Sequence, residues 1–224
     1  RRNTIPSVAI AGYTNAGKSS LLNRLTRAGV LVENALFATL DATVRRSATT
    51  DGRVYTMTDT VGFVRNLPHQ LVEAFRSTLE EVRDADLIVH VVDGSHPDPA
   101  AQLQTVRDVI GDVGARDTRE LVVFNKADLV DDDTRLVLRG LEPRALFVSS
   151  RTGEGFDALR AAVEEALPLP AVEVHAIVPY DRGDLVSAAH ETGMIVSQTH
   201  EADGTAIHAY VSERLAAELA PFTR

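Results

Sequence analysis

Residues 12 to 19 read G-Y-T-N-A-G-K-S, and this stretch constrains the fold more strongly than any other. Two glycines that bracket four residues, followed by lysine and serine, have the spacing of a phosphate-binding loop. Such a loop lies between a buried strand and a helix. Apolar residues 8–11 precede it, and Leu21, Leu22 and Leu25 follow it at helical spacing. The stretch predicts a strand, a loop and a helix that hold phosphate groups; the alternative is a glycine-containing turn before an ordinary helix.

The residue types of the loop suit phosphate and metal binding. Glycine lets successive backbone N–H groups converge on phosphate oxygens at the positive end of a helix. We expect Lys18 to reach the outer phosphates and Ser19 to ligate Mg²⁺. The residues expected to contact the nucleotide here are Gly12, Tyr13, Thr14, Asn15, Ala16, Gly17, Lys18, Ser19 and Ser20.

Lysine is rare in this chain. Only Lys18 and Lys126 are lysines among 23 lysine and arginine residues. An ammonium on a flexible stem is not interchangeable with a planar guanidinium. A sequence biased toward arginine therefore keeps lysine where arginine cannot replace it, and both lysines fall in nucleotide-binding motifs.

The composition excludes several classes of protein. With 224 residues and 44% hydrophobic side chains, the chain suits one medium domain and one small domain. No apolar run in the sequence approaches a membrane span. The formal charge of −9 argues against a protein that coats DNA by bulk electrostatics. The absence of cysteine fits the cytoplasm, where we expect the protein.

Apolar runs alternate with helical patterns over residues 7–168, after a linker remnant at residues 1–6. This alternation predicts an α/β domain with a mostly parallel six-stranded sheet and helices on both faces. Asp51-Gly52 marks a tight hairpin, which predicts one antiparallel strand. The expected strands are 8–11, 43–49, 53–58, 87–92, 121–124 and 146–148, and the expected helices are 19–28, 69–84, 98–113, 131–140 and 156–166.

The pattern changes after the stiff segment Pro168-Leu169-Pro170. Residues 169–224 are expected to form a small α+β domain. Its strands are placed at 172–178, 194–199 and 205–211, with a turn at Asp203-Gly204. Its helices are placed at 184–190, capped by Asp181 and stopped by Gly193, and after Ser212, carrying Leu215 and Leu219.

Two further segments are expected to reach the phosphates and the metal. Asp59-Thr60-Val61-Gly62 follows a strand, so that Asp59 can hold a Mg²⁺ water and the Gly62 N–H can reach the terminal phosphate. Thr39, in F-A-T-L-D, is placed to complete the Mg²⁺ shell, and Phe37 in the same segment to contact the nucleotide. The alternatives are Thr43 in that role, or a threonine in a mobile loop.

The segment Asn125-Lys126-Ala127-Asp128 follows an apolar strand at its carboxyl end, where ligands bind in open α/β sheets. Asp128 can accept hydrogen bonds from guanine N1–H and the exocyclic amine together, and adenine does not offer this donor pair. The motif therefore predicts GTP and GDP rather than adenine nucleotides. Ser149, Ser150 and Arg151, after the last strand, are expected beside the base.

Together these motifs resemble those of translation-factor-type GTPases, over residues 7–168. F-A-T-L-D and residues 62–81 are similar to the HflX family of ribosome-associated GTPases, and the tail V-P-Y-D-R-G-D-L to that family's C-terminal domain. The chain starts at Arg1, and the resemblance implies an upstream N-terminal domain that reaches into the large ribosomal subunit. It also implies rRNA contacts, hydrolysis stimulated by the ribosome, and splitting of stalled ribosomes.

Hydrolysis is expected to depend on Lys18, Thr39, Gly62 and Asn15. Phe63 stands where Ras-type enzymes carry the glutamine that orients water, so the intrinsic rate should be slow. In similar GTPases an asparagine at the place of Asn15 helps to hold K⁺. The alternative is that Asn15 only stabilises the loop.

Three other functions stay open at this point. They are the G domain of a tRNA-modification GTPase, the regulatory G domain of an iron transporter, and a nucleotide-gated scaffold.

Outside the motifs, the histidines, among them His69, His90, His175 and His208, show no metal-ligand spacing with carboxylates and are expected to be core or surface residues. Arg65, Arg76 and Arg83 are expected to meet rRNA phosphate or to form a solvated helix face.

Overall fold

The computed structural model describes residues 6–13, 15–26, 43–50, 54–60, 76–168, 170 and 172–224. The chain divides into two compact units. The larger unit spans Ser7–Ser47 and Tyr55–Leu167, and the smaller unit is built on Pro168–Arg224. Within the described ranges, none of the helices combines the length and the apolar character that crossing a bilayer requires.

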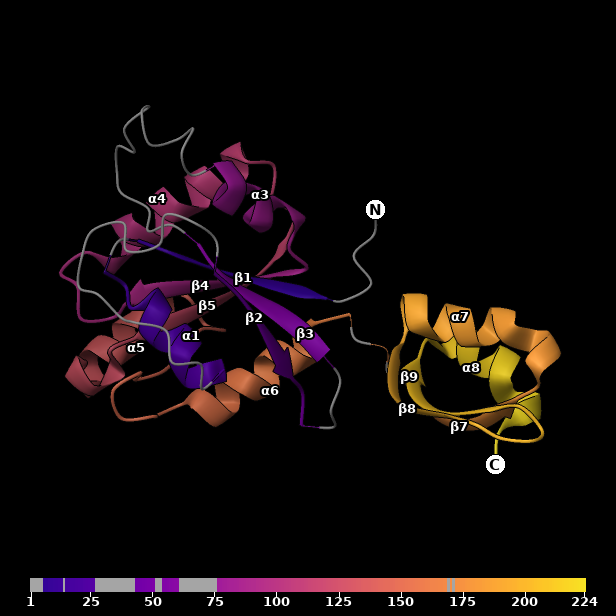
Figure 1. Ribbon diagram of the computed structural model, residues 1–224. Helices are drawn as coiled ribbons and strands as arrows, with labels where there is room; N and C mark the ends of the chain where they lie inside the picture. Colours follow the sequence, from indigo (N-terminus) through magenta and orange to yellow (C-terminus); the bar gives the residue numbers. More distant parts are fainter. Residues whose placement is uncertain are drawn as a thin grey trace. The chain divides into compact units, whose positions relative to one another are not determined.

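The larger unit contains a six-stranded sheet in the order β2-β3-β1-β4-β5-β6 (Figure 1). The pairs of β1 with β3, β1 with β4, β4 with β5 and β5 with β6 are parallel. β2 and β3 are neighbours joined by a connection too short for a parallel crossover, so β2 is the antiparallel strand that the Asp51-Gly52 hairpin predicts. The bounds are β1 Ser7–Gly12, β2 Thr43–Ala48, β3 Val54–Asp59, β4 Leu87–Asp93, β5 Arg119–Asn125 and β6 Leu146–Phe147.

Helices cover both faces of this sheet (Figure 1). They are α1 Lys18–Thr26, α3 Arg76–Asp84, α4 Pro99–Asp112, α5 Asp132–Leu141 and α6 Phe156–Ala166. Ala9, Ala11 and Ile88 on one face form a core with Leu79 and Val82 of α3 and with α4. The helix expected at 69–84 is described from Arg76 onward, and residues 69–75 lie outside the described part. The α/β architecture with a mostly parallel sheet is confirmed.

Aspartates begin two of these helices. Asp98 accepts a hydrogen bond from the Ala101 N–H at 3.1 Å, and Asp131 accepts one from the Thr134 N–H at 2.7 Å. Each carboxylate satisfies a backbone donor that a helix N-terminus leaves without a partner. The acidic run at residues 131–133 is therefore a helix start, as its sequence indicates.

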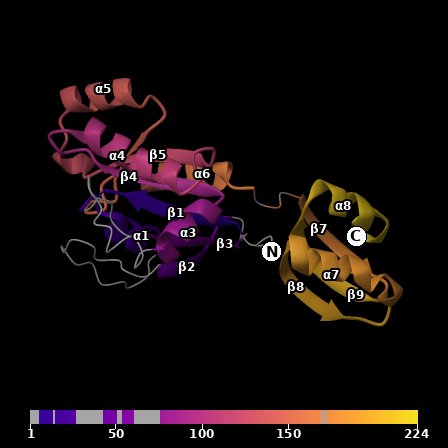
Figure 2. The ribbon, with the colours of Figure 1, turned by 90° about the horizontal axis from the view of Figure 1, so that it is seen from above.

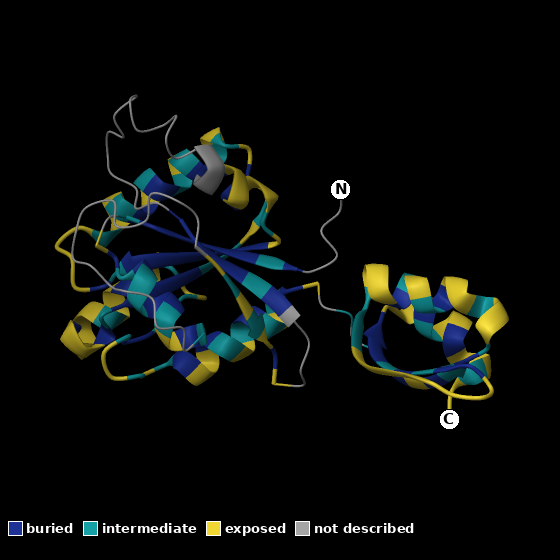
Figure 3. Ribbon diagram, in the orientation of Figure 1, coloured by how far each residue is buried: buried dark blue, intermediate teal, exposed yellow. Residues whose placement is uncertain are grey.

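Strand register brings the polar motif residues to one edge of the sheet. Asp59 lies opposite Ile10 in the β1·β3 pair, and Asn125 lies opposite Asp93 in the β4·β5 pair. Both pairs are parallel, so their carboxyl ends meet at the same edge. In Figure 3 the strands that lead to this edge are mostly buried, and buried strands fix the position of the loops that follow them.

The smaller unit is an antiparallel sheet in the order β7-β9-β8, with α7 and α8 packed on one face. Seen from above in Figure 2, α7 crosses in front of the three strands. The bounds are β7 Val172–Val178, α7 Gly183–Thr192, β8 Met194–His200, β9 Thr205–Val211 and α8 Glu213–Leu219. Inward-facing residues of β7 and β9 form a core with Leu185, Leu215 and Leu219.

One predicted helix cap in this unit is wrong. Asp181 lies in a 3-10 turn, Tyr180–Arg182, and α7 begins two residues later, so its carboxylate is not at the N-cap position. Asp184, in the first turn of α7, instead pairs with Arg182 at 3.1 Å. Gly193 ends α7 as predicted. Ser212 caps α8 by accepting from the Leu215 N–H at 3.2 Å.

Candidate nucleotide-binding site

The loop after β1 has the backbone that a phosphate cradle needs. Gly17 has φ of 92°, and a Cβ placed there would lie 2.4 Å from Asn125 Nδ2. At Gly12 a Cβ would lie 2.5 Å from the carbonyl oxygen of Val91. A side chain at either position would therefore clash with neighbouring atoms, so both positions require glycine.

Lys18 is buried at the start of α1, with 8% of its surface exposed. Burial lowers the pKa of its ammonium group, and the carboxylate of Asp59 opposes that shift. An ammonium with so little water around it gains strongly from a nearby anion. The position suits a side chain that neutralises phosphate.

Ser19 and Asp59 are brought together from two neighbouring segments. The Ser19 hydroxyl donates to Asp59 Oδ2 at 2.7 Å. A hydroxyl and a carboxylate are hard oxygen ligands of the kind that Mg²⁺ prefers. The two residues fit the Mg²⁺ roles expected from the sequence, Ser19 as a direct ligand and Asp59 through water.

Thr60 was missed by the sequence reasoning as a functional position, although it lies inside the D-T-V-G segment. Its side chain is buried and donates to the Ile10 carbonyl at 2.7 Å. The Thr60 N–H also donates to that carbonyl, at 3.2 Å. These two bonds hold the end of β3 against β1, and so they fix Asp59 beside Ser19.

Asn125 joins the phosphate loop to the loop beside the expected base. Its Nδ2 donates to the Ala16 carbonyl at 3.1 Å. Its Oδ1 accepts from the backbone N–H and the hydroxyl of Ser150, both at 3.2 Å. Asn125 is buried, so these bonds are shielded from water and position both loops relative to β5.

Lys126 has φ of 59°, a left-handed conformation that is uncommon for a residue with a Cβ. Its ammonium donates to the Asn15 carbonyl at 3.1 Å and pairs with Asp93 Oδ2 at 3.0 Å. Burial alone would raise the pKa of Asp93, but hydrogen bonds from Ser95 and Lys126 lower it. Sequence reasoning missed Asp93, even though it ends an apolar run at the carboxyl edge of the sheet.

Asp128 is placed by Ser149 and Arg151. The buried Ser149 hydroxyl donates to Asp128 Oδ1 at 2.8 Å, and Arg151 Nε lies 3.3 Å from Asp128 Oδ2. The Arg151 side chain is 82% exposed, so its ion pair is solvated and contributes little. The Ser149 hydroxyl and the Arg151 guanidinium thus fix the orientation of the Asp128 carboxylate.

Arg24 is a further residue that the motifs did not indicate. It donates from Nη1 to the Ser150 carbonyl at 3.2 Å, and its guanidinium lies 5.5 Å above the Phe156 ring. It therefore ties α1 to the loop after β6. An arginine in the last turn of a helix gives no signal that would single out this contact.

The structure brings most of the predicted nucleotide-contacting residues into one region at the carboxyl edge of the sheet. Tyr13 packs against the core beside β1, and Ser20 lies half-buried in the first turn of α1. The other predicted positions, Thr14, Phe37, Thr39 and Gly62, lie outside the described residues, as do Phe63 and Arg65.

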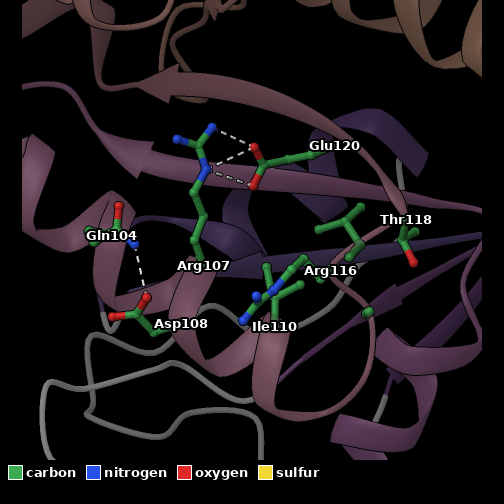
Figure 4. Close-up of a pocket in the computed structure, with 9 residues that line it drawn as sticks. Gln104, Arg107, Asp108, Ile110, Arg116, Thr118 and Glu120 are labelled. Carbon is green, nitrogen blue, oxygen red and sulfur yellow. Dashed lines mark hydrogen bonds and ion pairs between the residues drawn. The ribbon is translucent and has the colours of Figure 1, made fainter.

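A cavity of about 400 Å³ lies elsewhere, between α4 and the beginning of β5 (Figure 4). Four of its polar side chains pair with one another. Arg107 binds Glu120 at 2.6 Å, and Gln104 donates to Asp108 at 2.9 Å. Asn125, at the other end of β5, belongs to the nucleotide motif, so this cavity is separate from it.

The described histidines differ in how they match the prediction that none has metal-ligand spacing with a carboxylate. His90 is a core residue, as predicted, with Nδ1 3.0 Å from Glu120 Oε2. His175 and His208, however, group with Glu173 in a cluster whose ligand atoms lie within 4.8 Å of one another. The prediction that the histidines lack metal-ligand spacing with carboxylates is therefore wrong for His175 and His208. Glu173 and His175 are two apart on a strand and share a face, while His208 comes from the paired strand.

Residues 7–126, more than half of the chain, match the family described as 50S ribosome-binding GTPase. The chain belongs to this family. It is also 42% identical over 220 residues to "GTPase HflX" of Lacrimispora saccharolytica, covering 98% of this chain and 52% of the relative. The resemblance to HflX is confirmed, and the chain spans about half the length of the curated relatives it matches.

Solved structures agree with a GTPase G domain. A GTP-binding protein of Sulfolobus solfataricus in complex with GDP is 27% identical, with a TM-score of 0.57, and the match covers 72% of this chain and 52% of that chain. The G domain of the T. maritima iron transporter FeoB is 25% identical, with a TM-score of 0.53, over 72% of this chain and 98% of that domain.

Proposed function

We propose that this protein is a switch that binds GTP and GDP with Mg²⁺ and hydrolyses GTP slowly by itself. The observation that carries the proposal is the Asn125 side chain, which bridges the Ala16 carbonyl and Ser150. This bridge couples the loop suited to phosphates to the loop suited to guanine. It supports one nucleotide bound across both.

In this proposal each predicted site residue has a task. Lys18 neutralises the outer phosphates, Ser19 ligates Mg²⁺ and Asp59 holds a Mg²⁺ water. Asp128 accepts from guanine, with Ser149, Ser150 and Arg151 around the base. Thr39 and Gly62 complete the metal shell and sense the terminal phosphate, so that their segments order with GTP and are released after hydrolysis.

Asn15 is proposed to help hold K⁺ near the phosphates and thereby speed hydrolysis, since Phe63 cannot orient the attacking water. Asn15 has φ of 66° and its side chain is exposed. The competing role, stabilisation of the loop, is favoured by the bond from Lys126 to the Asn15 carbonyl. Equal rates of GTP hydrolysis in K⁺ and Na⁺ buffer would contradict the K⁺ role and leave only the stabilisation of the loop.

The proposed partner is the large ribosomal subunit with its rRNA, in ribosome splitting or rescue, and the proposed location is the cytoplasm. The family description and the similarity to HflX proteins support this partner. We propose residues 7–168 as the G domain and 169–224 as the C-terminal domain. Ribosome binding is proposed for the whole protein, because this chain covers only 52% of the length of the HflX relative.

The main alternative is a regulatory G domain of an iron transporter. The FeoB G domain is matched over 98% of its length by 72% of this chain, whereas the HflX relative is matched by 98% of this chain. Of these two similarities, the one to HflX extends through the smaller unit. The second alternative, the G domain of a tRNA-modification GTPase, predicts a partner with cysteine chemistry. The tail of this sequence does not supply that chemistry, since the sequence has no cysteine.

The test is steady-state GTP hydrolysis by the full-length protein, alone and with purified large ribosomal subunits, in K⁺ and in Na⁺ buffer. We expect slow turnover alone and strong stimulation by the subunits. GTP binding without any stimulation would contradict the ribosomal role and leave the nucleotide site intact. No binding of guanine nucleotide would contradict both.

A further inference from the structure

The outer face of the smaller unit's sheet carries three side chains that the nucleotide site does not use. Glu173 and His175 lie on the same face of β7, two residues apart. His208 of β9 is the register partner of His175 in the antiparallel pair. The helices α7 and α8 pack on the other face, so nothing within this unit's core requires an ionisable group here.

The three side chains converge on one point. His208 Nε2 lies 2.6 Å from Glu173 Oε1, and His175 Nε2 lies 3.5 Å from the same oxygen. The two imidazole rings are stacked, with centroids 4.1 Å apart and an angle of 14° between their planes. Both Nε2 atoms therefore face the same carboxylate oxygen.

From this geometry we propose that Glu173, His175 and His208 form a site for a borderline divalent transition-metal ion such as Zn²⁺, Co²⁺ or Ni²⁺. Two imidazole nitrogens and a carboxylate oxygen are a common donor set for these ions, with water in the remaining position. Around a tetrahedral ion with bonds of about 2.1 Å, donor atoms lie about 3.4 Å apart. The ligand atoms here all lie within 4.8 Å of one another.

The side chains are free to make the remaining adjustment. Glu173 is 49% exposed and His175 is 60% exposed, so both can rotate without displacing core atoms. His208 is 25% exposed and lies beside the Tyr210 ring, with centroids 6.1 Å apart. The more constrained His208 supplies a fixed ligand, and the two residues of β7 close on the ion.

A bound ion would join β7 to β9 by a link between side chains. The backbones of these strands already pair along their full length, from Val172 with Val211 to Val178 with Thr205. The ion therefore needs no change in register. Its effect would be to stabilise the smaller unit, and the nucleotide site would not be needed for binding.

The test is a Zn²⁺ and a Co²⁺ titration of the full-length protein without an affinity tag, followed by calorimetry and by the visible absorption of Co²⁺. Excess Mg²⁺ is present to occupy the oxygen ligands Ser19 and Asp59. We expect one ion per chain and a Co²⁺ spectrum typical of nitrogen and oxygen ligands. We also expect Zn²⁺ to raise the melting temperature.

His175→Ala and His208→Ala are each expected to weaken metal binding by about tenfold or more, because loss of even outer-shell groups costs that much. His200→Ala is the matched control, since His200 is exposed in the same unit, on β8, outside the cluster. The control should bind like the unchanged protein. The proposal is overturned if the unchanged protein binds no ion, or if both cluster variants bind as tightly as the control.

Discussion

Lys126 donates a hydrogen bond to the backbone carbonyl of Asn15 at 3.1 Å. Within the described part of the chain, these two are the non-glycine residues with positive φ, at 59° and 66°. Strained conformations of this kind cluster where a site has to be held in one geometry. The bond therefore couples strain in the phosphate loop to strain in the N-K-A-D segment.

Lys126→Met removes this bond and the ion pair with Asp93. We expect the affinity for GDP to fall by about tenfold, because neither loop is then held in its left-handed conformation. Fluorescent GDP binding measures the change. Arg214→Ala is the control, since this side chain is 92% exposed in the smaller unit. Unchanged affinity in Lys126→Met would show that the coupling is incidental.

The contact between Ser19 and Asp59 predicts how nucleotide release depends on magnesium. In the unchanged protein, removal of Mg²⁺ with EDTA should accelerate GDP release. Ser19→Ala lacks the direct ligand, so its release should be fast both with and without Mg²⁺. Stopped-flow fluorescence gives both rates. A Ser19→Ala protein that still responds to Mg²⁺ as the unchanged protein does would contradict the assignment.

Gly17→Ala should abolish nucleotide binding, because the new Cβ would lie 2.4 Å from Asn125 Nδ2 at a φ of 92°. The matched control is Gly140→Ala in α5, where a Cβ would have nothing within 4 Å. That control should bind GDP normally and be more stable by up to about 1 kcal/mol, since alanine favours a helix. Thermal unfolding shows whether both variants fold. Normal GDP binding by a folded Gly17→Ala protein would contradict the geometry of the loop.

Glu120 gives a prediction about pH and stability. Burial alone would raise its pKa, but hydrogen bonds with His90 and Arg107 outweigh burial and lower the pKa to about 2. Because the folded-state pKa lies below the ordinary value, the stabilisation is present above about pH 4.3 and is lost as the pH falls toward 2. Glu120→Gln should therefore lower the free energy of unfolding at pH 7 by about 1 to 2 kcal/mol, after allowing for solvent screening.

Urea unfolding from pH 7 down to pH 3 checks this expectation. The difference between the unchanged protein and Glu120→Gln should shrink as the pH falls. Glu213→Gln, which changes an exposed carboxylate in α8, is the control for the substitution itself. A difference that stays constant over this range would mean that Glu120 acts through packing rather than through its charge.

The sequence predicted the architecture well because its signals are local. The strands Val172–Val178 and Thr205–Val211 are found with the predicted bounds, since apolar residues at two-residue spacing and a turn at residues 203–204 define them in the sequence. The nucleotide motifs were located for the same reason, because each consists of particular residue types a few positions apart in one segment. The predicted cap of α7 was wrong because Asp181 and Asp184 are both residue types that suit a helix start. The 3-10 turn at Tyr180–Arg182 places Asp181 before the helix, and the sequence does not reveal this turn.

Contacts between distant segments could not be read in this way. The pair of Lys126 with Asp93, the bond from Arg24 to Ser150, and the group of Glu173, His175 and His208 each join separate elements. They depend on which strands are neighbours and in what register. The cluster of Glu173 and His175 gives a partial signal at two-residue spacing, but its third member appears only once β7 is paired with β9.

Guanine recognition by Asp128 is the most direct test of the proposed function. We would measure competition of GDP, ADP and xanthosine diphosphate against fluorescent GDP for the unchanged protein and for Asp128→Asn. The unchanged protein should bind GDP far more tightly than ADP. Asp128→Asn should lose roughly a hundredfold in GDP affinity and gain affinity for the xanthine nucleotide. The same preference for GDP in both proteins, or binding of ADP as tight as GDP by the unchanged protein, would contradict the proposal.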